Sequence, residues 1–148
     1  MDFFTELFSN RALISAMIAW LIAQLLKVPI CLLTEKKLNF MMLVSSGGMP
    51  SSHSATICAL ATACGVNEGV GSPIFALCAI FAFIVMYDAA GVRRAVGQQA
   101  KILNKIMDDI SEGKTEEINS KLKELVGHTK LEVIAGAALG VIVGLIFA

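Results

Sequence analysis

The chain has 148 residues, about the length of one domain. Hydrophobic residues make up 56% of it and charged residues 16%, whereas soluble domains hold about 45–50% and about 25%. With a mean hydropathy of +0.74, this composition indicates an integral membrane protein, and the zero net charge argues against a nucleic-acid partner.

The N-terminal segment "MDFFTELFSNR" carries Asp2 and Glu6 where a signal peptide needs positive charge. The first apolar run, residues 12–33, is therefore expected to be a retained membrane span. At about 1.5 Å per residue this run extends about 33 Å as a helix, which is long enough to cross a bilayer.

Three further spans follow. Residues 50–66 form a short candidate rich in Ala, Ser, Cys and Thr. Because small residues let helices approach closely, this span is expected at the centre of the bundle. Residues 73–90 and 131–148 complete the set, and the last span carries a ridge of small residues suited to tight packing or to dimerisation: Gly136, Gly140 and Gly144.

A polar excursion over residues 91–130 separates the last two spans. Apolar residues recur in it at helical spacing, first at Val96, Ala100, Leu103, Met107 and Ile110, and more weakly at Ile118, Leu122 and Leu125. A break at 111–113 divides the two stripes. We expect two short amphipathic helices on the membrane surface or over the bundle, and the alternative is a solvated helical hairpin without chemistry of its own. The predicted fold is a single all-α membrane bundle of about four spans over residues 1–148.

Cysteines occur at four positions in apolar runs, without CxxC spacing or clustered histidines: Cys31, Cys58, Cys64 and Cys78. This pattern favours buried small hydrophobic side chains over disulfides or a zinc site.

Basic residues predict the orientation. The loop over 34–49 carries Lys36 and Lys37, and the excursion carries eight basic residues, whereas the loop between the second and third spans has only Glu68. The two basic loops are therefore expected on the cytoplasmic face, with both termini outside. Asp88 ends a long apolar run, so a partner such as a lysine or an arginine is expected for it. Ionisable residues at membrane depth often have a function, so the residues predicted at this face are candidates for a functional site: Lys27, His53, Asp88, Arg93, Arg94, His128 and Glu132.

The stretch "GGMPSSHSA", residues 47–55, has the features of an anion site. Pro50 suits the first helical position, which leaves three N–H groups without partners inside the helix, those of Ser51, Ser52 and His53. Free N–H groups at the positive end of a helix dipole bind phosphate, and Gly47 and Gly48 let the backbone approach closely. The alternative is an ordinary helix start with an interfacial histidine.

Other charged residues can complete such a site. Arg93 and Arg94 offer forked donors that match phosphate oxygens, and Lys27 offers a point charge. His128 and Glu132 are four residues apart and share a helix face, so Glu132 can fix the tautomer of His128 and leave the other ring nitrogen free to attack. The alternatives are a positive-inside anchor for the arginines, snorkelling for the lysine, and a capping role for the His–Glu pair.

Four segments in order resemble the divergent PAP2 family, small membrane proteins related to the type 2 phosphatidic acid phosphatases and the vanadium haloperoxidases. These segments are "KVP", "GGMPSSHSA", "YDAAGVRRAVGQQA" and "GHTKLEVIAGAALG". Within them, "PSSH" is similar to the PSGH motif, and "GHTKLE" is similar to the last motif, a histidine followed four positions later by an acid. The resemblance covers nearly the full length.

The resemblance implies a phosphatase that needs no metal or other cofactor. His128 would be the nucleophile that forms a phosphohistidine, Glu132 would orient it, and His53 would protonate the leaving alcohol. Ser51, Ser52 and nearby backbone N–H groups would hold phosphate oxygens. Two arginines of the PAP2 pattern are absent: Val28-Pro29 follow Lys27, and Lys121 and Leu122 stand where the second is usual. Arg93 and Arg94 are the candidates to replace them.

These features predict an enzyme of the bacterial plasma membrane that hydrolyses a lipid phosphomonoester at the cytoplasmic leaflet. Phosphatidate, phosphatidylglycerophosphate and prenyl phosphate are the candidate substrates, and membrane lipids are expected partners. Four spans enclose a pocket less completely than the larger bundles common in the PAP2 family, which favours a homodimer. The alternative function is a non-catalytic binder or transporter of an anionic lipid headgroup. A site confined to one face, without internal repeats, disfavours transport. A third interpretation is a structural subunit without a ligand. It requires that the non-functional interpretation given above is correct for every one of these charged and polar residues.

Overall fold

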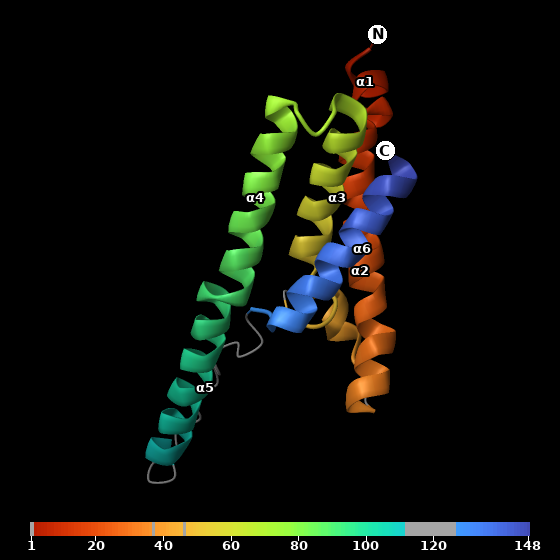
Figure 1. Ribbon diagram of the computed structural model, residues 1–148. Helices are drawn as coiled ribbons and strands as arrows, with labels where there is room; N and C mark the ends of the chain where they lie inside the picture. Colours follow the sequence, from red (N-terminus) through yellow and green to blue (C-terminus); the bar gives the residue numbers. More distant parts are fainter. Residues whose placement is uncertain (1, 37, 46, 112–126) are drawn as a thin grey trace.

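The computed structural model describes residues 2–36, 38–45, 47–111 and 127–148. They form the helices α1 (Phe3–Ser9), α2 (Arg11–Glu35), η1 (Phe40–Val44), α3 (Ser52–Glu68), α4 (Pro73–Ala90), α5 (Val92–Ser111) and α6 (Lys130–Phe147). No strand occurs in these ranges. The predicted all-α fold is confirmed (Figure 1).

The apolar helices match the predicted spans closely. Among the described residues, three helical stretches are long and apolar enough to cross a membrane: Arg11–Thr34, Pro73–Asp108 and Lys130–Phe147. α3 corresponds to the remaining predicted span, although it has only 17 residues. As its small residues predict, α3 is central, because it packs most extensively on α6, then on α2 and then on α4.

Small residues allow the close approach of α3 and α6. A Cβ added at Gly136 would overlap the carbonyl oxygen of Ser51, and one added at Gly140 would overlap that of Ala55. The small-residue ridge is therefore used inside the chain, where it brings two helix backbones together. Beside it lies a core of small side chains: Ala19, Ala23, Ala55, Ala59 and Val143.

Two helices add to the predicted bundle. α1 is a short helix that the sequence analysis did not predict, and it ends just before Asn10, whose side chain caps α2 by accepting the N–H of Leu13 at 3.0 Å. α5 contains the first apolar stripe of the polar excursion, and the second stripe, at Ile118, Leu122 and Leu125, lies outside the described residues. Only Gly91 separates α5 from α4, so α5 continues the direction of α4 and does not fold back over the bundle (Figure 1).

The two ends of the bundle differ in character. The chain termini lie at one end, where the Nη1 of Arg11 donates to the carbonyl oxygen of Ala148 at 3.0 Å (Figure 1). At the other end, the first turns of α3 and α6 meet the last turn of α4, beside the C-terminal half of α2 (Figure 1). The charged residues singled out in the sequence lie at this second end.

Candidate functional site

A buried lysine holds the loop that precedes α3. Lys27 is only 1% exposed, and its Nζ donates to the carbonyl oxygen of Ser45 at 2.8 Å. One turn earlier on α2, the Nε2 of Gln24 donates to the carbonyl oxygen of Leu43 at 2.9 Å. Gly48, at φ +89, brings the loop backbone close to the Lys27 side chain. The snorkelling hypothesis for Lys27 is therefore wrong, because its ammonium group is buried and bonded to the loop.

The first turn of α3 differs from its predicted form. The helix begins at Ser52 with Ser51 as its N-cap, so Pro50 precedes the cap and is not the first helical residue. The Ser51 side chain accepts from the N–H of Ser54 at 3.3 Å, which is the usual role of a capping serine. The Ser51 N–H is also taken, because it donates to the carbonyl oxygen of Glu132 at 3.0 Å. Of the three N–H groups predicted to be free, two lie in the first helical turn without a partner inside the helix, those of Ser52 and His53.

The two histidines of the chain lie side by side. His128 directly precedes the start of α6 and is 1% exposed, and its backbone N–H donates to the carbonyl oxygen of Ala89 at the end of α4, at 3.0 Å. The ring centroids of His53 and His128 are 6.0 Å apart with the planes at 63°. Within the described part of the chain, three buried ring nitrogens have no hydrogen-bond partner: Nδ1 of His53 and both nitrogens of His128. Buried polar atoms are rarely left without partners, so these nitrogens indicate a place for a ligand or water.

Glu132 both caps α6 and lies beside His128. Its Oε2 accepts the backbone N–H of Thr129 at 2.8 Å, and the Thr129 hydroxyl accepts the N–H of Glu132 at 3.3 Å, which completes a capping box. The same Oε2 is 3.4 Å from the Nδ1 of His128. This separation is outside good hydrogen-bond geometry, yet it permits charge attraction when the ring carries a proton. The capping and orienting interpretations are therefore compatible.

Of the two adjacent arginines, one faces the histidines. The Nε of Arg93 donates to Asp88 at 2.6 Å, which provides the partner that was expected for this aspartate. The Nη1 of Arg93 is 3.5 Å from the Nε2 of His53. The side chain of Arg94 is exposed, since successive residues on a helix point about 100° apart. Gly127, at φ +101, lies so close to the backbone of this arginine pair that any Cβ would overlap it, so the residue before His128 lies directly on α5.

Opposite charges surround the histidine pair. His53 experiences the electrostatic fields of Lys27, Arg93 and Asp88, and Lys27 is attracted by Glu132. A buried histidine with a carboxylate on one side and a second histidine on the other has the side-chain types that nucleophilic and acid–base catalysis require. The fixed cations beside them can offset the charge of a bound anion.

Sequence reasoning missed several residues that build the site. Gln24 carried a signal, because it is a polar residue in an apolar run and lies three positions before Lys27, on the same helix face. Gly127 directly precedes His128, but only the folded chain reveals its contact with α5. Lys121 and Leu122, where the PAP2 pattern usually has an arginine, lie outside the described residues.

Comparisons with known proteins identify the family of the chain. The model of the Divergent PAP2 family matches residues 8–143. The chain is 42% identical over 153 residues to the "Uncharacterized membrane protein YuiD" of Bacillus subtilis (strain 168), which covers 97% of each chain. No solved structure matches the chain. Because the family match includes both histidines, the loop before α3, three of the apolar helices and most of α6, this chain belongs to the divergent PAP2 family of membrane proteins.

Proposed function

We propose that this chain is an integral membrane phosphatase that hydrolyses a lipid phosphomonoester through a phosphohistidine. The observation that carries the proposal is the buried ring of His128, which has unpartnered nitrogens beside Glu132 on one side and His53 on the other. A fully buried histidine with an adjacent carboxylate and a second histidine is costly to retain as packing alone.

The positions of the ring atoms suggest the role of each histidine. Glu132 lies nearest the Nδ1 of His128, so it favours a proton on that atom and leaves Nε2 as the nucleophile. Arg93 is a donor near the Nε2 of His53, which favours the proton of that ring on Nδ1. The unpartnered Nδ1 of His53 is then the atom available to protonate the leaving oxygen.

The reaction then proceeds in two steps. The Nε2 of His128 attacks phosphorus in line with the ester oxygen, the P–O bond breaks, and His53 gives its proton to the departing alcohol. In the second step His53 accepts a proton from water, whose oxygen attacks phosphorus; the P–N bond breaks, inorganic phosphate is released, and the Nε2 of His128 is free again. Lys27, Arg93 and the first-turn N–H groups of α3 offset the charge on the phosphoryl oxygens.

The bilayer favours a lipid substrate. The site lies at one end of the apolar helices, at the depth where a lipid phosphate would lie. Phosphatidate, phosphatidylglycerophosphate and prenyl phosphate share this phosphomonoester. The basic loop residues place this end on the cytoplasmic side in the proposed orientation.

The experiment measures phosphate release by the purified chain in micelles, with each of the three lipid phosphates as substrate. We expect His128→Ala to abolish release and His53→Ala to lower it about 100-fold or more, because general acid catalysis contributes about that much. Lys130→Ala removes an exposed cation two residues beyond His128 and is the matched control, with activity near wild type.

A labelled-phosphate experiment tests the intermediate. Quenching at alkaline pH preserves a phosphohistidine, and we expect label on the wild type and on His53→Ala, but not on His128→Ala. Release from no substrate, or equal release by both histidine variants and the wild type, contradicts the proposal. Tight binding of the same lipids without release would favour the alternative, a non-catalytic binder of an anionic headgroup.

A further inference from the structure

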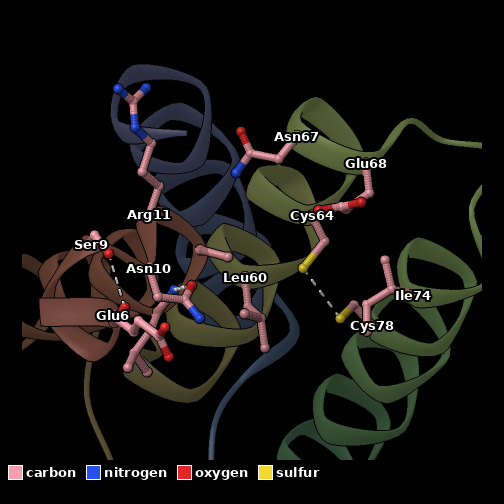
Figure 2. Close-up of a pocket in the computed structure, with 12 residues that line it drawn as sticks. Glu6, Ser9, Asn10, Arg11, Leu60, Cys64, Asn67, Glu68, Ile74 and Cys78 are labelled. Carbon is pink, nitrogen blue, oxygen red and sulfur yellow. Dashed lines mark hydrogen bonds between the residues drawn. The ribbon is translucent and has the colours of Figure 1, made fainter. Parts of the chain in front are cut away.

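The end of the bundle opposite the histidines contains a second feature, a cavity of about 960 Å³. It lies between the start of α2 and the facing ends of α3 and α4 (Figure 2). Its lining is mainly apolar in area, but it includes several polar side chains: Glu6, Ser9, Asn10, Asn67 and Glu68. Such a lining admits water and small polar reagents, although the cavity reaches the apolar helices.

Two thiols lie in the wall of this cavity. The Sγ atoms of Cys64 on α3 and Cys78 on α4 are 3.7 Å apart, and the dashed line in Figure 2 joins them. Both cysteines are free and 7% exposed. A disulfide has an S–S length of about 2.05 Å, so the two sulfur atoms need to approach by less than about 2 Å. Cys58, in contrast, contacts a methionine sulfur, that of Met86, at 3.9 Å.

The depth of the pair also permits reaction. Cys64 is four residues from the end of α3 and Cys78 is five residues from the start of α4, so each lies about 6–8 Å below its helix end. In the proposed orientation this end faces away from the cytoplasm, into the compartment where disulfides persist.

We propose that Cys64 and Cys78 form an oxidation site that closes to a disulfide between α3 and α4. The oxidant is a disulfide-bearing molecule. One cysteine thiolate attacks its S–S bond, which releases one thiol and forms a mixed disulfide. The second cysteine attacks the mixed disulfide and releases the second thiol. Two cysteine thiols are thereby oxidised, and one disulfide of the oxidant is reduced to two thiols.

The packing of α4 gives the cross-link a structural effect. α4 packs on α3 and only lightly on α6. Its far end carries Asp88, which holds Arg93, and Ala89, which accepts the backbone N–H of His128. A covalent bond at the other end of α4 limits its separation from α3 and stabilises the bundle.

The test uses the full chain in micelles, incubated with glutathione disulfide, then denatured and alkylated. We expect the wild type to lose two of its four thiols, and peptide mapping to join the peptides of Cys64 and Cys78. The oxidised protein should melt about 5 °C or more above the reduced protein by circular dichroism, and a dithiol reductant should reverse this shift.

Serine variants provide the controls. Cys64→Ser and Cys78→Ser each should keep three thiols or carry one mixed disulfide, with no cross-linked peptide. Cys31→Ser, which leaves the pair intact, should lose two of its three thiols. Wild-type protein that retains all four thiols, or a cross-link that joins Cys31 or Cys58, overturns the proposal. A cross-link at the proposed pair that leaves the melting temperature unchanged overturns the stabilising effect.

Discussion

The substitution Gly136→Ala tests the close packing that positions the site. Alanine is a better helix former than glycine by about 1 kcal/mol, so helix propensity alone predicts a more stable protein. In the folded chain, however, the new Cβ would lie 3.1 Å from both the carbonyl carbon and the Cβ of Ser51, and it would overlap the carbonyl oxygen. The backbone of α3 cannot turn aside as a flexible side chain can, so α6 must retreat by about 1 Å.

The cost of this retreat has two parts. Overpacking of a tight contact costs about 1–3 kcal/mol. The hydrogen bond from the Ser51 N–H to the Glu132 carbonyl oxygen, now 3.0 Å long, would stretch beyond bonding range and lose about 1 kcal/mol. After the gain in helix propensity, we expect a net loss of about 2 kcal/mol and a melting temperature about 4–8 °C lower.

Circular dichroism on heating measures the unfolding, because the described part of the chain is largely helical. Gly71→Ala is the matched control, since a Cβ at that loop position meets nothing within 4 Å, and its melting temperature should stay close to that of the wild type. If Gly136→Ala melts at or above the wild type, helix propensity decides its stability and α6 does not lie this close to Ser51.

Three further predictions concern the charged residues. Arg93→Gln should lower phosphate release about tenfold or more, because it removes a donor beside His53. Arg94→Gln, on the exposed side of the same turn, should change release less than about threefold. Equal losses would contradict the assignment of one arginine to the site. Glu132→Gln retains the capping box but lacks the charge beside His128, so release should fall about tenfold while the melting temperature stays near wild type; a large loss of stability would show that the carboxylate is mainly structural. Lys27→Met leaves the carbonyl group of Ser45 without its donor, so it should lower the free energy of unfolding by about 1–3 kcal/mol. It should also weaken lipid phosphate binding in the same micelles. A variant as stable as the wild type would contradict the buried hydrogen bond.

Much of the fold was predictable because it depends on local patterns. Apolar runs of sufficient length located α2, α4 and α6, and small residues predicted that α3 would be central. The short separation along the chain keeps Glu132 close to His128, but the predicted shared helix face is wrong, because α6 begins only at Lys130 and His128 precedes its N-cap. The order of the predicted spans also placed the ionisable residues at one end of the bundle, the end that carries the basic loops.

The remaining features depend on contacts between distant segments. Pro50 has the correct residue type for a first helical position, yet Ser51 supplies the cap, and its N–H is bound by a carbonyl group of α6. Which of the two arginines faces His53 depends on the rotation of α5 about its axis, since a helix fixes only their relative directions. Lys27 was predicted as a point charge for a phosphate, and its loop partner, Ser45, was missed because no pattern in the sequence marks that residue. Patterns in the sequence identified the types of residue in the site, and tertiary contacts decided their partners.

The length of α3 relates the site to the thickness of the membrane. Its 17 residues extend about 25 Å, a few Å less than the hydrocarbon core of about 30 Å. A bilayer adapts to a short hydrophobic element by thinning around it. α2, α4 and α6 surround α3, so its first turn, which carries His53, lies a few Å nearer the bilayer centre than the end of a full-length span. If the chain acts as the proposed lipid phosphatase, thinning of the bilayer beside the bundle brings substrate phosphate groups toward the level of His53, and acyl-chain length in the surrounding lipid becomes a variable that controls access.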